Sequence, residues 1–235
     1  GGGPHRHPGP GPRGPAHGGL PALDRTATAS VEVELASFAD VEALVPAAIT
    51  RRYPAPGTRD AEPSRLALVE FADPALPWLY SPEPPPGTPS RPWLVLVVGR
   101  ETDGELTIES GGAQPEATLN PTLLARLPPL SRSHQWAHVQ ALAGDRIARV
   151  LAPLVLEPHT DYVAAVVPAF RAGAGGVVED AWSPGEGSPV RLRAFASWRF
   201  RTGAADDFLA LALALEPQPA PASLGRVTGR VARLP

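Results

Sequence analysis

Residues 161–173, DYVAAVVPAFRAG, are decisive for the fold because they place a proline, Pro168, inside an otherwise apolar run. A central strand or a helix interior rejects proline, which has no backbone donor. The preceding residues, 162–167, are apolar and valine-rich, which is typical of a short buried strand. We therefore predict a strand over 162–167 that ends where the backbone donor of Pro168 is no longer needed and then runs into an irregular loop.

Other short segments show strand patterns of the same kind. Residues 26–35, TATASVEVEL, alternate apolar and polar side chains and predict a half-buried strand with Val31, Val33 and Leu35 on one face and Glu32 and Glu34 on the other. Residues 93–98 are continuously apolar, which suits a strand covered on both faces. The full set of further predicted strands is 65–71, 92–100, 106–110, 134–142 and 190–200.

Helical signals are few. Residues 120–127, NPTLLARL, combine an N-cap asparagine with proline at the first helical position. Residues 144–153 also predict a short helix that stops before Pro153. Residues 206–215, DDFLALALAL, alternate like a strand but have helical propensity and two leading acids, and we predict a short helix there.

Prolines define the rest of the architecture. The chain has 31 prolines in 235 residues, many in loops such as 81–92 and 216–223. Loops of this composition forbid long helices and interrupt parallel βαβ units. The sequence therefore predicts a mostly β fold, a β-sandwich or distorted barrel with short helices and long proline-rich loops, formed by one domain over 20–235. Residues 1–19, almost all Gly, Pro, His and Arg, predict a disordered tail or linker.

Composition narrows the classes of partner. The formal net charge is -3, which suggests no general attraction to nucleic acid. There is no cysteine, so disulfides, thiolate nucleophiles and cysteine zinc sites are excluded. No apolar run is long enough for a membrane span, and no signal peptide is visible in this segment. We expect a piece of a longer protein, located in the cytoplasm or released with an extracellular assembly.

Residues that might carry chemistry form no complete constellation. His134 and His138 stand four apart in a predicted strand, but no third metal ligand is fixed by spacing. Ser131 and Ser133 lie outside any G-x-S-x-G motif, and the glycines of 171–182 lack phosphate-binding spacing. The sequence thus predicts no catalytic residue, no cofactor and no metal site, and it favours a non-catalytic protein over an enzyme.

Aromatic residues beside the loops are the candidates for contact with a ligand or partner. Trp78 and Trp182 lie in predicted loops, with Tyr80 and Asp180 close to them in sequence. Exposed tryptophans stack on sugars, whereas core filling is the commoner use of tryptophan in a large β domain. Both interpretations stay open from the sequence.

Five blocks in order along the chain carry a resemblance: 76–82 (LPWLYSP), 91–98 (RPWLVLVV), 136–140 (WAHVQ), 156–173 (LEPHTDYVAAVVPAFRAG) and 197–208 (SWRFRTGAADDF). Together they resemble a bacterial family of hypothetical proteins associated with contractile-injection and phage-tail-like gene clusters, over most of 60–230. Ala169 and Arg171 stand where that family tends to have threonine and glutamate. The resemblance implies a baseplate or tail-associated structural module and implies no catalytic residue.

Two functional hypotheses follow. The first is a structural or interaction module that binds protein partners in a larger assembly through its proline-rich loops, which lose little entropy on docking. The alternative is a carbohydrate-binding or carbohydrate-processing domain, with Trp78 and Trp182 exposed beside acids such as Asp180. The alternative requires both tryptophans to be exposed beside a cleft.

Overall fold

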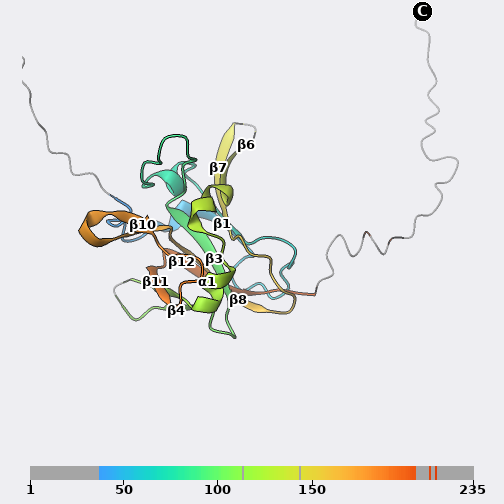
Figure 1. Cartoon of the computed structure of the whole chain (residues 1–235). Coiled ribbons are helices and arrows are strands. Elements are labelled where there is room, and N and C mark those ends of the chain that lie inside the picture. The colour runs from blue at the N-terminus through green and yellow to red at the C-terminus, as the bar shows by residue number, and fades with distance from the viewer. Residues whose placement is uncertain (1–36, 113, 143, 205–211, 213–214, 216–235) are drawn as a thin grey trace, which may run out of the picture. The chain divides into compact units, whose positions relative to one another are not determined.

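The computed structural model describes residues 37–112, 114–142, 144–204, 212 and 215 (Figure 1). Residues 37–204 belong to one compact unit of the chain. The predicted tail at 1–19 and the predicted strand at 26–35 lie outside the described residues, as does the segment 206–215 apart from Ala212 and Leu215. In the described part, no helix has the length and apolar character needed to cross a membrane.

The described part is mostly β, as predicted, with small antiparallel sheets in a sandwich-like arrangement and few, short helices. The largest sheet has the order β1 (Ile49–Tyr53), β2 (Leu68–Phe71), β7 (Asp145–Leu151) and β6 (Ala137–Leu142). A second sheet has the order β12 (Ala196–Arg201), β8 (Asp161–Pro168) and β3 (Leu94–Arg100). A third has the order β11 (Val190–Arg193), β5 (Glu116–Leu119) and β4 (Leu106–Glu109), and a fourth pairs β10 (Val178–Asp180) with β9 (Phe170–Ala172).

Short helices connect these strands. The α-helix is α1 (Pro121–Arg126), and the 3₁₀ helices of the described part are Pro46–Ala48, Leu76–Trp78, Leu130–Gln135 and Ala174–Gly176. The Oδ1 of Asn120 accepts a hydrogen bond from the N–H of Leu123 at 2.9 Å, so the N-cap predicted for this segment is confirmed.

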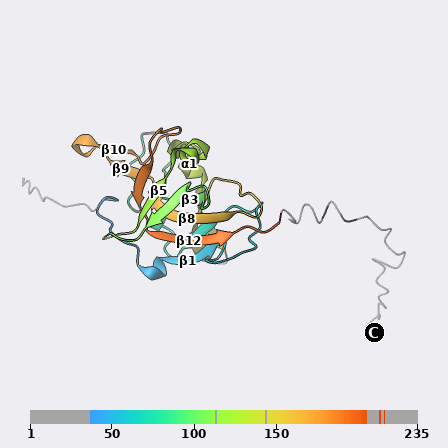
Figure 2. The ribbon, with the colours of Figure 1, turned by 90° about the horizontal axis from the view of Figure 1, so that it is seen from below.

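Strand β8 lies in the middle of its sheet, between β3 and β12 (Figure 2). Its residues 162–167 are buried, and so are residues 94–99 of β3. Both strands are covered on both faces, which explains why their sequences are continuously apolar. The predicted strands at 92–100 and 162–167 are confirmed.

The strand ends at Pro168, which is itself the last residue of β8, one position beyond the predicted range 162–167. The N–H of Ala169 donates to the carbonyl of Trp93 at 2.7 Å, so the backbone of position 168 points to the opposite side, toward β12. Strand β12 pairs only as far as Val166, which faces Ala196. The missing donor of Pro168 therefore costs no ladder hydrogen bond. The chain then enters the short strand β9 and not the irregular loop that we predicted.

Three predicted segments differ from the structure. Residues 144–153 are not a helix but contain β7, in which Ala148 and Val150 are buried and alternate with half-buried residues. Residues 190–200 are not one strand: they split at 194–195 into β11 and β12, which belong to different sheets. The strand predicted at 134–142 starts only at Ala137, because the preceding residues form a 3₁₀ helix.

The remaining strand predictions are confirmed with shorter bounds. Strands β2 and β4 lie within the predicted segments 65–71 and 106–110. Strands β1, β5, β9 and β10 were not predicted. The last three have only three or four residues, too few to show an alternation of apolar and polar side chains. Nearby glycines and prolines in the sequence further hide that alternation.

The outer edge of β12 is covered by the segment 57–61. Its backbone exchanges hydrogen bonds with β12: Gly57 N–H to Arg199 O (2.8 Å), Arg201 N–H to Thr58 O (2.7 Å) and Ala61 N–H to Arg201 O (3.0 Å). Gly57 has a φ of 79°, the left-handed conformation that a tight turn after Pro56 requires. The buried indole of Trp198 donates to Pro54 O at 2.9 Å and anchors the start of this turn.

A buried carboxylate joins β3, β4 and α1. Glu105 has no exposed surface, and its carboxylate accepts hydrogen bonds from the side chain and backbone N–H of Arg100 (both 2.9 Å) and from Arg126 (2.8 Å). Burial raises the pKa of Glu105, but the hydrogen bonds from Arg100 and Arg126 outweigh it, so the pKa lies below its usual value. The hydrogen bond between the side chains of Arg100 and Glu105 also raises the pKa of Arg100.

We expect Glu105→Ala to lower the free energy of unfolding by about 3 kcal/mol, because two guanidinium groups lose the acid between them. Urea denaturation at neutral pH measures this change. Glu109→Ala, at an exposed position in β4, serves as the control and should change stability by less than about 0.5 kcal/mol.

The same carboxylate predicts a pH dependence. Because folding lowers the pKa of Glu105, its contribution is complete above the ordinary value of 4.5 and is lost as the pH falls through the folded pKa. The stability difference between the wild type and Glu105→Gln should therefore narrow below that pH. A difference that stays constant between neutral and strongly acidic pH would contradict this assignment.

Candidate functional site

The proline-rich segment 82–92 is fixed to the body of the protein at both ends. Just before it, the ring of Tyr80 meets Trp93 edge-on with centroids 5.3 Å apart, and the buried indole of Trp93 donates to Leu76 O at 2.7 Å. At its end, Arg91 donates to Asp180 at 2.8 Å and lies over the Phe170 ring, 4.7 Å from the centroid. The segment is irregular but held in place by side chains.

A hollow of about 390 Å³ lies beneath this segment, and we call it the proline hollow. Arg91 and Asp180 form an ion pair on its wall, with Phe170 beside them. Its lining consists of Pro82, Glu83, Pro84, Pro85, Thr88, Pro89, Arg91, Ser131, Phe170 and Asp180. The hollow thus offers rigid apolar rings together with one partly exposed ion pair.

Of the four contact residues predicted from sequence, the structure brings Asp180 to the proline hollow. Trp78 and Tyr80 are half-buried and pack against the core. Trp182 lies between strands, as predicted, but it is only 1% exposed, so it lacks the exposure that the carbohydrate hypothesis required. Its indole N–H has no hydrogen-bond partner among the described residues. The pair of exposed tryptophans that the carbohydrate hypothesis required is therefore not formed.

A second hollow of about 210 Å³ lies on the other side of Phe170, and we call it the arginine hollow. It separates β9 from β11, and Phe38 packs against Phe170 there with ring centroids 6.0 Å apart. Its lining consists of Phe38, Ala39, Pro168, Phe170, Arg171, Ala172, Arg191, Leu192, Arg193 and Phe195. Our sequence reasoning missed this site, although the alternation of Val190 to Arg193 carried a signal for it.

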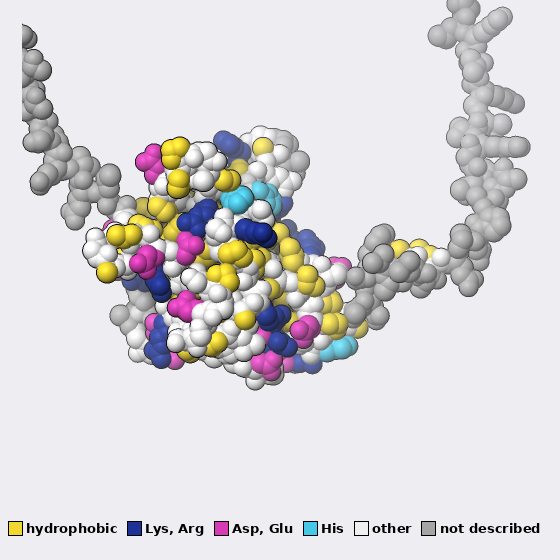
Figure 3. All heavy atoms as spheres, in the orientation of Figure 1, with side chains coloured by type: hydrophobic (Ala, Val, Ile, Leu, Met, Phe, Trp, Pro, Cys, Tyr) yellow, Lys and Arg dark blue, Asp and Glu magenta, His cyan; other side chains and the backbone are white. Residues whose placement is uncertain are grey.

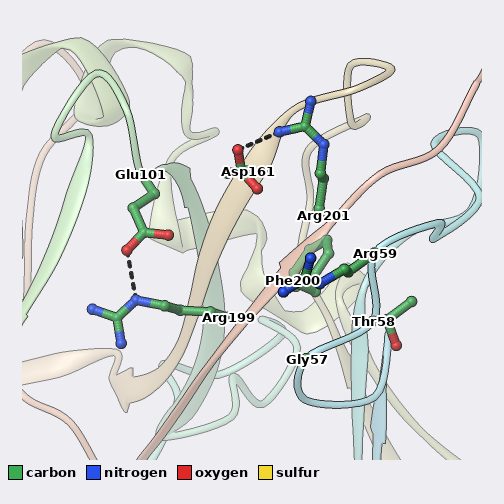
Figure 4. A pocket seen from close by; sticks show the side chains of 8 residues that line it. All are labelled: Gly57, Thr58, Arg59, Glu101, Asp161, Arg199, Phe200 and Arg201. Atoms are coloured by element: carbon green, nitrogen blue, oxygen red, sulfur yellow. Dashed lines mark hydrogen bonds and ion pairs between the residues drawn. The ribbon is translucent and has the colours of Figure 1, made fainter.

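A third hollow, of about 490 Å³, lies at the exposed face of β12 (Figure 4). Arg199 pairs with Glu101 at 2.6 Å, and Arg201 pairs with Asp161, its cross-strand neighbour. The lining also includes Arg59, so two carboxylates face three guanidinium groups. Exposed pairs of this kind contribute about 0–1 kcal/mol each. A mixture of both charges is also seen on the face in Figure 3, where basic and acidic side chains are interspersed.

The histidines considered as metal ligands do not share a strand face. His134 lies in the 3₁₀ helix, with its Nδ1 3.2 Å from Ser131 O, whereas His138 is exposed on β6. Among the described residues, no three His, Asp or Glu side chains gather closely enough to hold a metal ion.

The contacts of Arg91 predict its effect on the loop. In Arg91→Ala, the amide of Thr88 should exchange with solvent about tenfold faster, because the ion pair and the ring contact that fix the segment are lost. Hydrogen exchange followed by NMR measures this rate. Arg132→Ala, at an exposed position, should leave it unchanged; equal rates in wild type and Arg91→Ala would show that the prolines alone fix the segment.

Comparison with known proteins identifies no counterpart of these hollows. No family model, no curated protein and no solved structure matches this chain. What can be said of the sites rests on their own residues, and the fold that carries them is a mostly β fold of small antiparallel sheets.

Proposed function

We propose that this chain is a non-catalytic structural or interaction module that binds a protein partner through the proline hollow. The observation that carries the proposal is the fixation of the segment 82–92 by the Arg91–Asp180 pair and by the contact of Arg91 with Phe170. A surface that is already ordered loses little conformational entropy when a partner docks on it. The proline rings add to this because their backbone is restricted before binding.

The lining of the hollow supports one kind of contact. Four prolines and Phe170 present apolar rings, while Arg91 and Asp180 present a hydrogen-bonding pair at one wall. Tyrosine and tryptophan combine an apolar body with a polar tip and are enriched at protein interfaces. The partner of this proposal is therefore a folded protein that inserts such an aromatic side chain under the segment 82–92.

The class of assembly comes from the sequence resemblance. The five blocks resemble a family associated with contractile-injection and phage-tail-like gene clusters, in which a baseplate or tail-associated module binds its neighbours. Three of these blocks, 76–82, 91–98 and 156–173, contribute Pro82, Arg91 and Phe170 to the lining of the hollow. On this proposal the partners are other components of the same assembly.

The test is binding between the full chain and the purified products of its neighbouring genes. Ser131 is exposed and lines the hollow, so Ser131→Arg should fill it and weaken binding about tenfold or more without touching the core. Isothermal titration calorimetry gives the affinity. Ser110→Arg, the same change at an exposed position outside the lining, should leave it within about twofold.

Two results would overturn the proposal. One is that no neighbouring product binds the full chain. The other is that a neighbour binds Ser131→Arg as tightly as the wild type, since the contact then lies elsewhere on the surface.

A further inference from the structure

Within the described part of the chain, no strand pairs with the edge of β9 that faces the arginine hollow. Two flanking bonds, Ala181 N–H to Ala169 O (2.9 Å) and Gly173 N–H to Val177 O (2.7 Å), fix the phase of the β9–β10 ladder. In an antiparallel pair, alternate residues point their backbone groups to the same side. The N–H and C=O of Phe170 and Ala172 therefore point away from β10. They point to the side on which β12 pairs with β8 as far as Val166.

Strand β11 presents a second edge to the same hollow. The bond from Ala194 N–H to Pro115 O, 2.9 Å, fixes the phase of its ladder with β5. By the same alternation, the backbone groups of Arg191 and Arg193 point away from β5. No backbone hydrogen bond within the described ranges reaches the outward groups of either edge. A strand edge without hydrogen-bond partners is a template for an added strand, and here two such edges face the same hollow.

The side chains around the hollow specify what kind of strand fits. Its floor is apolar, formed by Pro168, Leu192 and Phe195. Three arginines surround it: Arg171 pairs with Glu179 at 3.3 Å, Arg191 with Glu116 at 3.6 Å, and Arg193 donates to the carbonyl of Val41. Both ion pairs are largely solvent-exposed and therefore weak. A strand with apolar side chains on one face and acids on the other is complementary to this lining.

This chain contains a segment of that chemistry. Residues 31–35, VEVEL, alternate three apolar side chains with Glu32 and Glu34. We propose that residues 31–35 of a second copy of the chain add as a strand to the edge of β9 that faces the arginine hollow, with their acids facing the arginines of the hollow. This is β-strand addition, in which the main chain supplies the hydrogen bonds and alternate side chains supply the specificity.

The contact joins two different surfaces, because one copy gives the strand and the next gives the hollow. A head-to-tail contact of this kind generates rings when it closes and linear arrays when it does not. Phe170 borders both hollows, but the arginines that test this contact lie outside the lining of the proline hollow, so that self-association and the binding of a neighbouring protein can fail separately.

Charge reversal in the full chain tests the proposal. Size-exclusion chromatography with light scattering should show concentration-dependent self-association of the wild type. The donor variant, Glu32→Arg with Glu34→Arg, and the acceptor variant, Arg191→Glu with Arg193→Glu, should each associate about tenfold or more weakly. Their mixture should associate again, since the unchanged strand of the acceptor variant then meets the unchanged hollow of the donor variant, and the reversed strand meets the reversed hollow. Glu109→Arg serves as the charge control and should associate like the wild type.

Hydrogen exchange locates the contact. On association, the amides of Phe170 and Ala172 should become protected, whereas the amide of Arg171 already faces β10 and should change little. A wild type that stays monomeric at its highest soluble concentration would overturn the proposal. So would self-association that is insensitive to both charge reversals, or a mixture of the two variants that stays monomeric.

Discussion

The described part of the chain depends on the pairing of β8 with β3 and β12. Buried backbone must find its hydrogen-bond partners inside the protein, and β8 finds them on both sides along nearly its whole length. Where β12 stops opposite Val166, that requirement is no longer met from one side, and the sequence places Pro168 at that point. The change of sheet at 194–195, the arginine hollow and the edge of β9 that has no partner among the described residues all lie beside this interruption.

Phe170 connects the two candidate surfaces. It lies directly after the interruption, with Arg91 over its ring on the side of the proline hollow and Phe38 against it on the side of the arginine hollow. Trp93 adds to this aromatic group, since its ring centroid lies 5.3 Å from those of both Tyr80 and Phe195, and Phe195 also lines the arginine hollow. A change of these rings would therefore act on both hollows at once, whereas Ser131 and Arg191 are exposed and belong to one hollow each.

The sequence predicted the elements that local rules determine. The strands at 92–100 and 162–167, with their apolar runs, the N-cap of Asn120 and the end of β8 beside Pro168 depend on residues next to one another in the chain, and they are confirmed. The helix predicted at 144–153 failed because its alternation is meaningful only beside β6 and β2, which give β7 its partners on both sides. Likewise, no local signal shows that 190–200 divides between two sheets.

The candidate surfaces were less accessible to sequence reasoning. Asp180 was selected with Trp182, yet adjacent position did not predict that Asp180 would meet Arg91 while Trp182 would be buried. The arginine hollow assembles residues from the start of the described chain, from β9 and from β11, which are separated by more sequence than any pattern spans. The arginines of this hollow are evident in the sequence, but only the tertiary fold brings them together.

Residues 57–61 cover the outer edge of β12 and so close one edge of the β12–β8–β3 sheet to a further strand. A foreign strand cannot pair with β12 until the Gly57, Thr58 and Ala61 hydrogen bonds are broken and the turn anchored at Trp198 is peeled away. An outer strand whose backbone groups are unpaired can pair with strands of other chains and so lead to aggregation. With that flank covered, strand addition at β12 is blocked, whereas the short edge of β9, in a separate two-stranded sheet, lies among arginines that select for an acidic strand.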